Sequence, residues 1–138
     1  MTLDRRSFLK LVGAGAGAAG AAGLPMIGRA AELMPKSGRR VVVVGGGYGG
    51  TIAAKYVRML DKSIEVVMIE RNKQFVSCPF SNFYIAGLTK DMNALTIGYD
   101  KLTANHGVKM VYAEVTGIDP AAKKVVTSEG TLDYDRLI

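Results

Sequence analysis

The sequence predicts an α/β fold in which a doubly wound parallel sheet is covered by helices. Residues Val41–Val44 are all valine, a pattern typical of a strand buried on both faces. A glycine-rich turn follows, and residues 51–60 then repeat apolar side chains with the period of a helix. A second apolar run, Ile64–Ile69, returns the chain to the sheet as a parallel strand. The predicted helix carries one apolar face: Ile52, Ala53, Tyr56, Val57 and Leu60.

The turn after the first strand is a G-x-G-x-x-G motif with Gly45, Gly47 and Gly50 in the three glycine positions. In such a unit the first glycine permits a tight turn, the second lets a pyrophosphate approach the backbone, and the third lets helix and strand pack closely. The phosphates then lie at the positive end of the helix dipole. The motif therefore predicts a Rossmann-like dinucleotide-binding unit. The alternative is a βαβ unit whose glycine turn holds no ligand.

An acidic residue ends the second predicted strand. Glu70 follows Gly50 by 20 residues, where a dinucleotide-binding fold places the carboxylate that binds the adenosine ribose. A carboxylate at this position favours a free ribose 2′-hydroxyl. The sequence therefore predicts FAD or NAD rather than NADP.

The remaining segments predict further elements and a small antiparallel meander. Residues 71–87 lack regular periodicity. The predicted elements are a helix over 99–105 that stops at Gly107, a strand over 108–115, a turn at 117–120, antiparallel strands over 123–127 and 131–134, and the start of another buried strand over 135–138. Because the sequence stops within an apolar strand, we expect residues 39–138 to be an incomplete domain, truncated at its C-terminus.

Composition excludes several other functions. The formal net charge is +6, but half of it lies in the first thirty residues and the rest forms no Lys/Arg run, which argues against a nucleic-acid partner. The chain has one histidine, His106, and one cysteine, Cys78, so we expect no metal site and no nucleophile triad. His106 precedes Gly107 at a predicted helix end, where a cation favours the dipole.

Residues 1–30 resemble a twin-arginine export signal. Arg5 and Arg6 are followed by Phe8-Leu9-Lys10, and an Ala/Gly-rich stretch covers residues 11–27. A membrane span is the competing interpretation, but Gly and Ala contribute little transfer free energy. We expect cleavage near Ala30 or Ala31, then a short N-terminal arm over 31–38 and the nucleotide-binding domain over 39–138.

Such a signal also bears on the cofactor. The twin-arginine translocase carries proteins that are already folded, often with their cofactor bound, so a protein that binds a cytoplasmically made nucleotide would need this route to the periplasm. Free NADH is scarce outside the cytoplasm. The prediction therefore moves from NAD to FAD and to electron transfer in the periplasm.

A further motif, Ser77-Cys78-Pro79-Phe80-Ser81-Asn82, follows the glycine loop and Glu70. Together with the export signal, these segments resemble the flavoprotein subunits of flavocytochrome c sulfide dehydrogenases. Those subunits belong to the two-dinucleotide-binding-domain flavoproteins, as do disulfide reductases, sulfide:quinone oxidoreductases and type II NADH dehydrogenases. The resemblance extends over the fragment, including these segments: Arg39–Gly50, Ile64–Glu70, Gly98–Asp100 and Thr131–Ile138.

The resemblance implies an FAD-dependent oxidoreductase that oxidises sulfide and passes the electrons through the flavin to a c-type cytochrome subunit. It implies that the three loop glycines hold the pyrophosphate, that Glu70 holds the adenosine ribose, and that Cys78 forms a thioether with the 8α carbon of FAD. Cys78 is the only cysteine in the sequence, so the redox-active cysteine pair of that family is expected beyond Ile138.

Three alternatives stay open. One is another FAD oxidoreductase of the same superfamily, linked to quinone or to NADH. Another is an inactive truncated fragment that binds nucleotide weakly or not at all. The third concerns Cys78 alone, which in this interpretation is a small buried hydrophobic residue.

Overall fold

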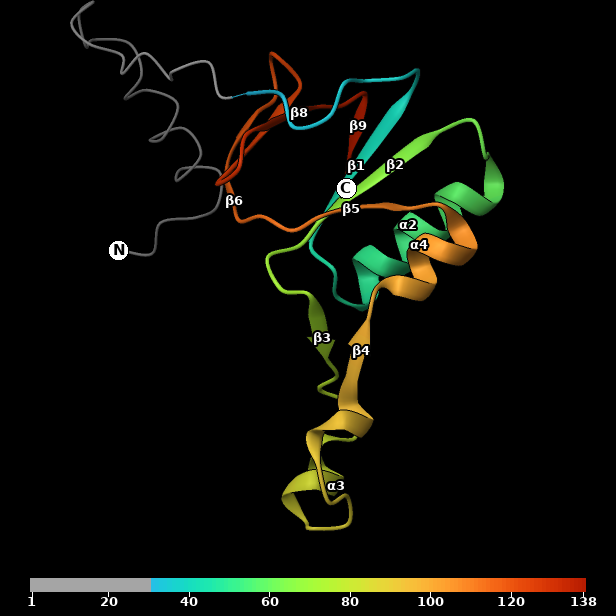
Figure 1. Cartoon of the computed structure of the whole chain (residues 1–138), viewed down its shortest axis with the longest axis vertical. Helices are drawn as coiled ribbons and strands as arrows, with labels where there is room; N and C mark the ends of the chain where they lie inside the picture. Colours follow the sequence, from blue (N-terminus) through green and yellow to red (C-terminus); the bar gives the residue numbers. More distant parts are fainter. Residues whose placement is uncertain (1–30) are drawn as a thin grey trace, which may run out of the picture.

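A four-stranded parallel sheet forms the centre of the described part of the chain. The computed structural model describes residues 31–138, so the export signal expected over residues 1–30 lies outside the described residues. The strands run in the order β5–β2–β1–β9, and every neighbouring pair is parallel (Figure 1). Their bounds are β1 Arg40–Val44, β2 Glu65–Ile69, β5 Lys109–Val111 and β9 Arg136–Leu137. The order reverses at β1, which confirms the doubly wound sheet.

The valine run of β1 packs on both sides of the sheet. Val42 and Val43 have no exposed surface. Successive side chains of a strand point to opposite faces, so Val41 and Val43 pack with Ala54 on one side, and Val42 packs with Val125 on the other. The expectation of a strand buried on both faces is confirmed.

Two helices, α2 (Tyr48–Leu60) and α4 (Asp100–His106), cover one face of the sheet (Figure 1). α2 begins three residues before the predicted start because Gly47, inside the glycine loop, is already its N-cap. α4 ends where predicted, with Gly107 in the left-handed conformation at φ 66°.

The apolar face predicted for α2 is only partly buried. Ile52 and Tyr56 are about half exposed, and Leu60 is 85% exposed. The helix instead turns Gly50 and the fully buried Ala54 toward β1. These two residues lie one turn apart on the same face, and their small size permits the close approach of helix and strand.

A three-stranded antiparallel sheet covers the other face of the parallel sheet through a second apolar cluster. Its strands are β6 Val115–Asp119, β7 Lys124–Thr127 and β8 Thr131–Asp133, and they pair in the order β6–β7–β8. This is the small meander that the sequence predicts.

The boundaries around β6 differ from the prediction. The strand predicted over 108–115 is two strands, because β5 ends at Val111 and β6 begins at Val115. The turn predicted at 117–120 was wrong, since residues 117–119 belong to β6. Gly117 pairs with Val126, and the register shift between Val115 and Gly117 leaves out Thr116. The chain turns after Asp119, whose Oδ1 accepts the Ala122 N–H at 2.9 Å.

Residues 71–98 form an excursion that projects from the sheet (Figure 1). Strands β3 (Gln74–Val76) and β4 (Thr96–Gly98) pair antiparallel at its base. The short helices α3 (Ser81–Ile85) and η1 (Met92–Leu95) lie between them. Cys78 lies between β3 and α3.

The N-terminal arm is docked on the domain through Arg40, whose side chain has no exposed surface. Its Nε donates to Glu65 Oε2 at 2.6 Å. Its guanidinium also donates to the carbonyl oxygens of Met34 at 3.0 Å and Pro35 at 2.7 Å. A buried guanidinium is stable only when its donors are satisfied, so Arg40 fixes the arm against the sheet.

Candidate functional site

The glycine loop joins β1 to α2 at the carboxyl end of the parallel strands. Gly45 has φ +97°, in the left-handed region that favours glycine. A Cβ on Gly50 would collide with the carbonyl oxygen of Gly45. Both glycines are therefore required by the protein itself, one for the turn and one for the approach of α2 to β1.

Gly47 differs from the other two motif glycines. It has φ −70°, which any residue adopts, and a Cβ built there would meet only the Phe75 ring, at 3.9 Å. No atom of residues 31–138 therefore requires glycine at this position. Gly47 borders open space at the start of α2, where no side chain of the described residues caps the helix and no acidic residue lies in the first turn. Free backbone N–H groups at such a terminus favour an anion.

Glu70 lies beside this loop and is held in place by three hydrogen bonds. Its Oε2 accepts the backbone N–H of Gly46 at 2.7 Å. Its Oε1 accepts the backbone N–H of Asn72 at 2.9 Å and the side-chain amide of Asn72 at 3.2 Å. Burial opposes ionisation, but these hydrogen bonds outweigh it and lower the pKa of Glu70. The carboxylate is thus fixed in its ionised form with lone pairs left for another donor.

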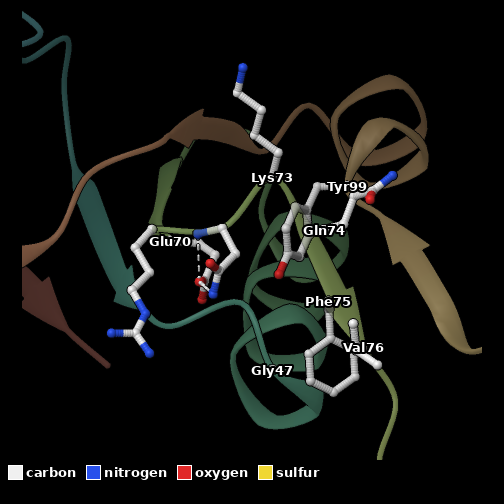
Figure 2. A pocket seen from close by; sticks show the side chains of 9 residues that line it. Gly47, Glu70, Lys73, Gln74, Phe75, Val76 and Tyr99 are labelled. Atoms are coloured by element: carbon white, nitrogen blue, oxygen red, sulfur yellow. Dashed lines mark hydrogen bonds between the residues drawn. The ribbon is translucent and has the colours of Figure 1, made fainter. Parts of the chain in front are cut away.

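A pocket of about 720 Å³ opens between Glu70 and the base of the excursion. Figure 2 shows the Glu70 carboxylate and the Tyr99 hydroxyl directed into this region. That volume lies in the range of small-molecule sites. The lining residues are Gly47, Glu70, Arg71, Asn72, Lys73, Gln74, Phe75, Val76 and Tyr99.

Tyr99 forms the wall of the pocket next to the glycine loop. It is 4% exposed, and its hydroxyl donates to the carbonyl oxygen of Gly46 at 3.1 Å. A Cβ on Gly46 would overlap this hydroxyl. Burial, followed by the negative charge of Glu70, raises the pKa of Tyr99, so the hydroxyl keeps its proton and remains a donor.

Cys78 lies outside this pocket lining and is exposed, so its interpretation as a small buried residue was wrong. Its neighbour Ser77 is buried, and the Ser77 hydroxyl lies 2.5 Å from the hydroxyl of Tyr48, the first residue of α2. The structure therefore brings Gly45, Gly47, Gly50 and Glu70 together directly. It connects Cys78 to them through the preceding residue, Ser77, which contacts Tyr48.

Sequence analysis missed the polar side chains that complete the site. Asn72 belongs to none of the quoted motifs. Tyr48, Ser77 and Tyr99 lie within quoted segments, but the sequence assigned no contact to their side chains. Tyr99 reaches Gly46 across 53 residues of sequence. Only the fold brings Ser77 and Tyr99 to the loop, so no local pattern indicated these contacts.

Two further findings concern the described residues as a set. Within residues 31–138, no group of three or more His, Cys, Asp or Glu side chains is arranged to hold a metal ion. No helix in that range combines the length and apolar character needed to cross a bilayer.

Comparison with known proteins places this chain in a family. The sequence profile of the pyridine nucleotide-disulphide oxidoreductases matches residues 39–138, which include the glycine loop, Glu70 and the meander. The chain belongs to this family. A pyridine nucleotide-disulphide oxidoreductase has a flavin cofactor, and the site described above lies at the carboxyl end of the strands, where such folds bind dinucleotides.

Individual members of the family differ in how much of the chain they match. A stretch of 44 residues, 32% of the chain, is 61% identical to the sulfide dehydrogenase (flavocytochrome c) flavoprotein chain of Chlorobaculum thiosulfatiphilum and covers 92% of that relative. A longer stretch of 107 residues, 76% of the chain, is 31% identical to the type II NADH:quinone oxidoreductase of Staphylococcus haemolyticus and covers 26% of it. The first match confirms the resemblance to flavocytochrome c flavoproteins.

A solved structure also matches the fold of this chain. The sulfide:quinone oxidoreductase of Aquifex aeolicus superposes with a TM-score of 0.66 at 26% identity, over 72% of this chain and 23% of that one. The chain thus spans about a quarter of the length of this enzyme and of the staphylococcal relative.

Proposed function

We propose that this chain is the FAD-binding part of a flavoprotein that oxidises sulfide and passes the electrons through the flavin to a c-type cytochrome. The observation that carries the proposal is the exposed Cys78, the only cysteine, connected to the glycine loop through Ser77 and Tyr48. The 61% identity to a flavocytochrome c flavoprotein chain supports the choice of sulfide dehydrogenase over its relatives.

The residues around the loop fit the phosphate and ribose parts of FAD. Gly47 borders open space that the described residues leave unfilled, next to the uncapped start of α2. We assign the pyrophosphate to the loop of Gly45, Gly47 and Gly50. We assign the adenosine ribose to Glu70, whose ionised carboxylate accepts hydroxyl donors and repels a 2′-phosphate.

Cys78 is assigned the link to the isoalloxazine ring. The thiol is exposed, so it is accessible to a bound flavin. The Cys78 sulfur would hold the flavin by a C–S bond that replaces the S–H bond and one 8α C–H bond; the two protons would be released, and the two electrons would pass through the flavin to the c-type cytochrome or to dioxygen. A tethered flavin suits the periplasm, because a lost FAD is not easily replaced there.

The rest of the proposal concerns the whole protein. Export by the twin-arginine translocase to the periplasm, cleavage near Ala30 or Ala31, and redox cysteines beyond Ile138 remain predictions. FAD, when bound, accepts an electron pair from sulfide and releases single electrons to a haem. The part described here contributes the binding of the nucleotide and the anchor for its ring.

A quinone-linked enzyme that oxidises NADH is the second candidate. It is favoured by the 31% identity that extends over 76% of the chain to the staphylococcal type II NADH:quinone oxidoreductase. That candidate assigns no flavin link to Cys78. The two candidates therefore differ in the chemistry of a single side chain.

The test uses the full-length gene product with its export signal. The purified protein is denatured in acid, and the flavin that stays with the precipitate is measured against the flavin released. A peptide map then asks whether the peptide that contains Cys78 carries the mass of FAD. Cys78→Ser is the matched variant, because Ser has almost the same size and the position is exposed.

We expect acid-stable flavin on the Cys78 peptide, its loss in Cys78→Ser, and reduction of the c-type cytochrome by sulfide. Flavin that is released intact from the wild type contradicts the link and favours the quinone-linked candidate. A protein that takes up no flavin at all favours the inactive fragment.

A further inference from the structure

Two hydroxyl groups connect the start of α2 to the residue before Cys78. The Tyr48 hydroxyl lies 2.5 Å from Ser77 Oγ. The Tyr48 ring meets the Phe75 ring edge-on, with centroids 4.9 Å apart and an interplanar angle of 80°. Tyr48 follows Gly47 directly, and Cys78 follows Ser77 directly. The bond therefore joins the proposed pyrophosphate loop to the proposed flavin anchor by side chains next to each.

The direction of this hydrogen bond follows from the protons available. Ser77 has one hydroxyl proton, and its Oγ donates that proton to the carbonyl oxygen of Pro79 at 3.0 Å. The Tyr48 hydroxyl is then the donor to Ser77 Oγ. Ser77 is only 5% exposed, so loss of the Tyr48 hydroxyl leaves its oxygen without that donor in a largely dry position.

The backbone around Cys78 is held on both sides while its thiol stays exposed. The Ser77 N–H donates to the carbonyl oxygen of Leu95 at 2.8 Å, and the Ser81 N–H donates to the carbonyl oxygen of Cys78 at 3.0 Å. These bonds lie within the excursion. The Tyr48–Ser77 bond is different, because it ties this segment to the helix that begins at the glycine loop.

We propose that Tyr48 and Ser77 are positioning residues that fix Cys78 relative to the glycine loop for formation of the flavin thioether. The inference rests on the proposed function, since it assigns the pair a role in the link between Cys78 and FAD. Bond formation requires the sulfur and the 8α carbon to be held in near-contact geometry, and a small displacement of one partner lowers the rate strongly. Both hydroxyls act through Cys78 rather than on the flavin itself.

The test compares Tyr48→Phe and Ser77→Ala with the wild type in the full-length protein. Tyr48→Phe keeps the ring against Phe75 and removes only the hydroxyl. The matched control is Tyr56→Phe, because Tyr56 lies on the same helix, is about half exposed, and its hydroxyl makes no hydrogen bond within residues 31–138. Ser77→Thr restores a hydroxyl at position 77.

Two readouts separate positioning from general loss of binding. The first is the rate at which added FAD becomes acid-stable, measured beside the total FAD retained by the folded protein. The second is amide hydrogen exchange of residues 77–81, measured before FAD is added, so that it does not depend on the cofactor. We expect Tyr48→Phe and Ser77→Ala to lower the rate of covalent incorporation about threefold to tenfold, with total FAD unchanged. Exchange at Ser77 and Ser81 should rise by a similar factor, while Tyr56→Phe and Ser77→Thr behave as the wild type.

Each remaining outcome decides a different point. An unchanged rate of incorporation in Tyr48→Phe overturns the inference while the proposed function stands. A wild type without acid-stable flavin overturns both the link and the assigned role in it. In that case faster exchange in Tyr48→Phe still establishes that the pair orders the segment, and unchanged exchange excludes even that.

Discussion

The carboxylate of Glu70, at the end of β2, accepts the backbone N–H of Gly46 in the glycine loop at 2.7 Å. This bond joins Glu70, the residue proposed to bind the ribose, to the proposed pyrophosphate loop. One contact therefore fixes the position of the carboxylate relative to the loop. Hydrogen bonds to a charged group contribute about 1.5–3 kcal/mol each.

Glu70→Gln is expected to weaken FAD binding about tenfold to a hundredfold, because the neutral amide is a poorer acceptor for both the Gly46 N–H and a ribose hydroxyl. The measurement is titration of the apoprotein with FAD in a Cys78→Ser background, where no covalent link hides the affinity. Glu129→Gln, in the turn between β7 and β8, is the control. Equal affinity in Glu70→Gln and Glu129→Gln would contradict the ribose assignment.

Substitutions at Gly47 and Gly50 should separate binding from folding. Gly50→Ala forces a Cβ against the Gly45 carbonyl oxygen, so we expect it to lower the free energy of unfolding by about 1–3 kcal/mol. Gly47→Ala meets only the Phe75 ring at 3.9 Å, so its stability should stay within about 0.5 kcal/mol of the wild type.

Gly47→Ala should nevertheless weaken FAD binding about tenfold or more, because the new methyl group lies where the pyrophosphate approaches. Urea unfolding and FAD titration of both variants provide the comparison. If Gly47→Ala bound FAD normally, the open space at this glycine would not be the phosphate position.

Glu65 should give stability that depends on pH. Burial opposes ionisation of Glu65, but the hydrogen bonds and charges of Arg40 and Lys109 outweigh it, and the pKa of Glu65 is lowered from 4.5. A carboxyl whose folded-state pKa is lowered stabilises the protein above its unfolded-state pKa and loses this contribution as the pH falls through the lowered value. The wild type should therefore lose stability as the pH falls below 4.5.

Glu65→Gln should remove that part of the pH dependence and cost about 3 kcal/mol at neutral pH, because Arg40 is left buried without its carboxylate. Urea unfolding of both proteins between neutral pH and pH 3 tests this. In Glu65→Gln the dependence of the free energy of unfolding on pH should become weaker rather than vanish, since the pKa values of Glu70 and Asp135 are also lowered. Parallel pH curves for wild type and Glu65→Gln would show that the ion pair does not contribute.

Tyr99→Phe should weaken FAD binding about fivefold by removing the donor that holds the Gly46 carbonyl oxygen. The ring remains, so the pocket wall keeps its shape and the protein should fold as before. Tyr112→Phe, at an exposed tyrosine, is the control in the same titration. A loss of FAD affinity in both variants, or in neither, would contradict the assignment of Tyr99 to the FAD site.

Sequence patterns were sufficient for the parts of the fold that local chemistry determines. The valine run, the glycine turn and the strand that ends at Glu70 each follow from a pattern within about ten residues, and all three lie where predicted. The antiparallel meander was also predicted, because its strands alternate around turn residues. Its first boundary was misplaced, since the register shift between Val115 and Gly117 depends on pairing with β7.

Long-range side-chain contacts could not be predicted in the same way. Arg40 is a charged residue at a strand end, which usually lies in solvent. Here it is buried because Glu65, the arm and β8 supply acceptors from three separate segments. Tyr99 is similar, since its hydroxyl finds Gly46 only after α4 packs beside α2.

The pairing of β1 with β9 also limits when the parallel sheet can be completed during translation. Asp135 accepts the backbone N–H of Arg40 across 95 residues of sequence, and β9 covers one edge of the central strand. At a translation rate of about 5–20 residues per second, about 5–20 s pass between the synthesis of β1 and that of β9. This edge of β1 has no strand beside it during that time. During this interval an unpaired valine-rich strand is available to other nascent chains. Synthesis of β9, rather than of the glycine loop, therefore determines when this edge of β1 is protected from pairing with other chains.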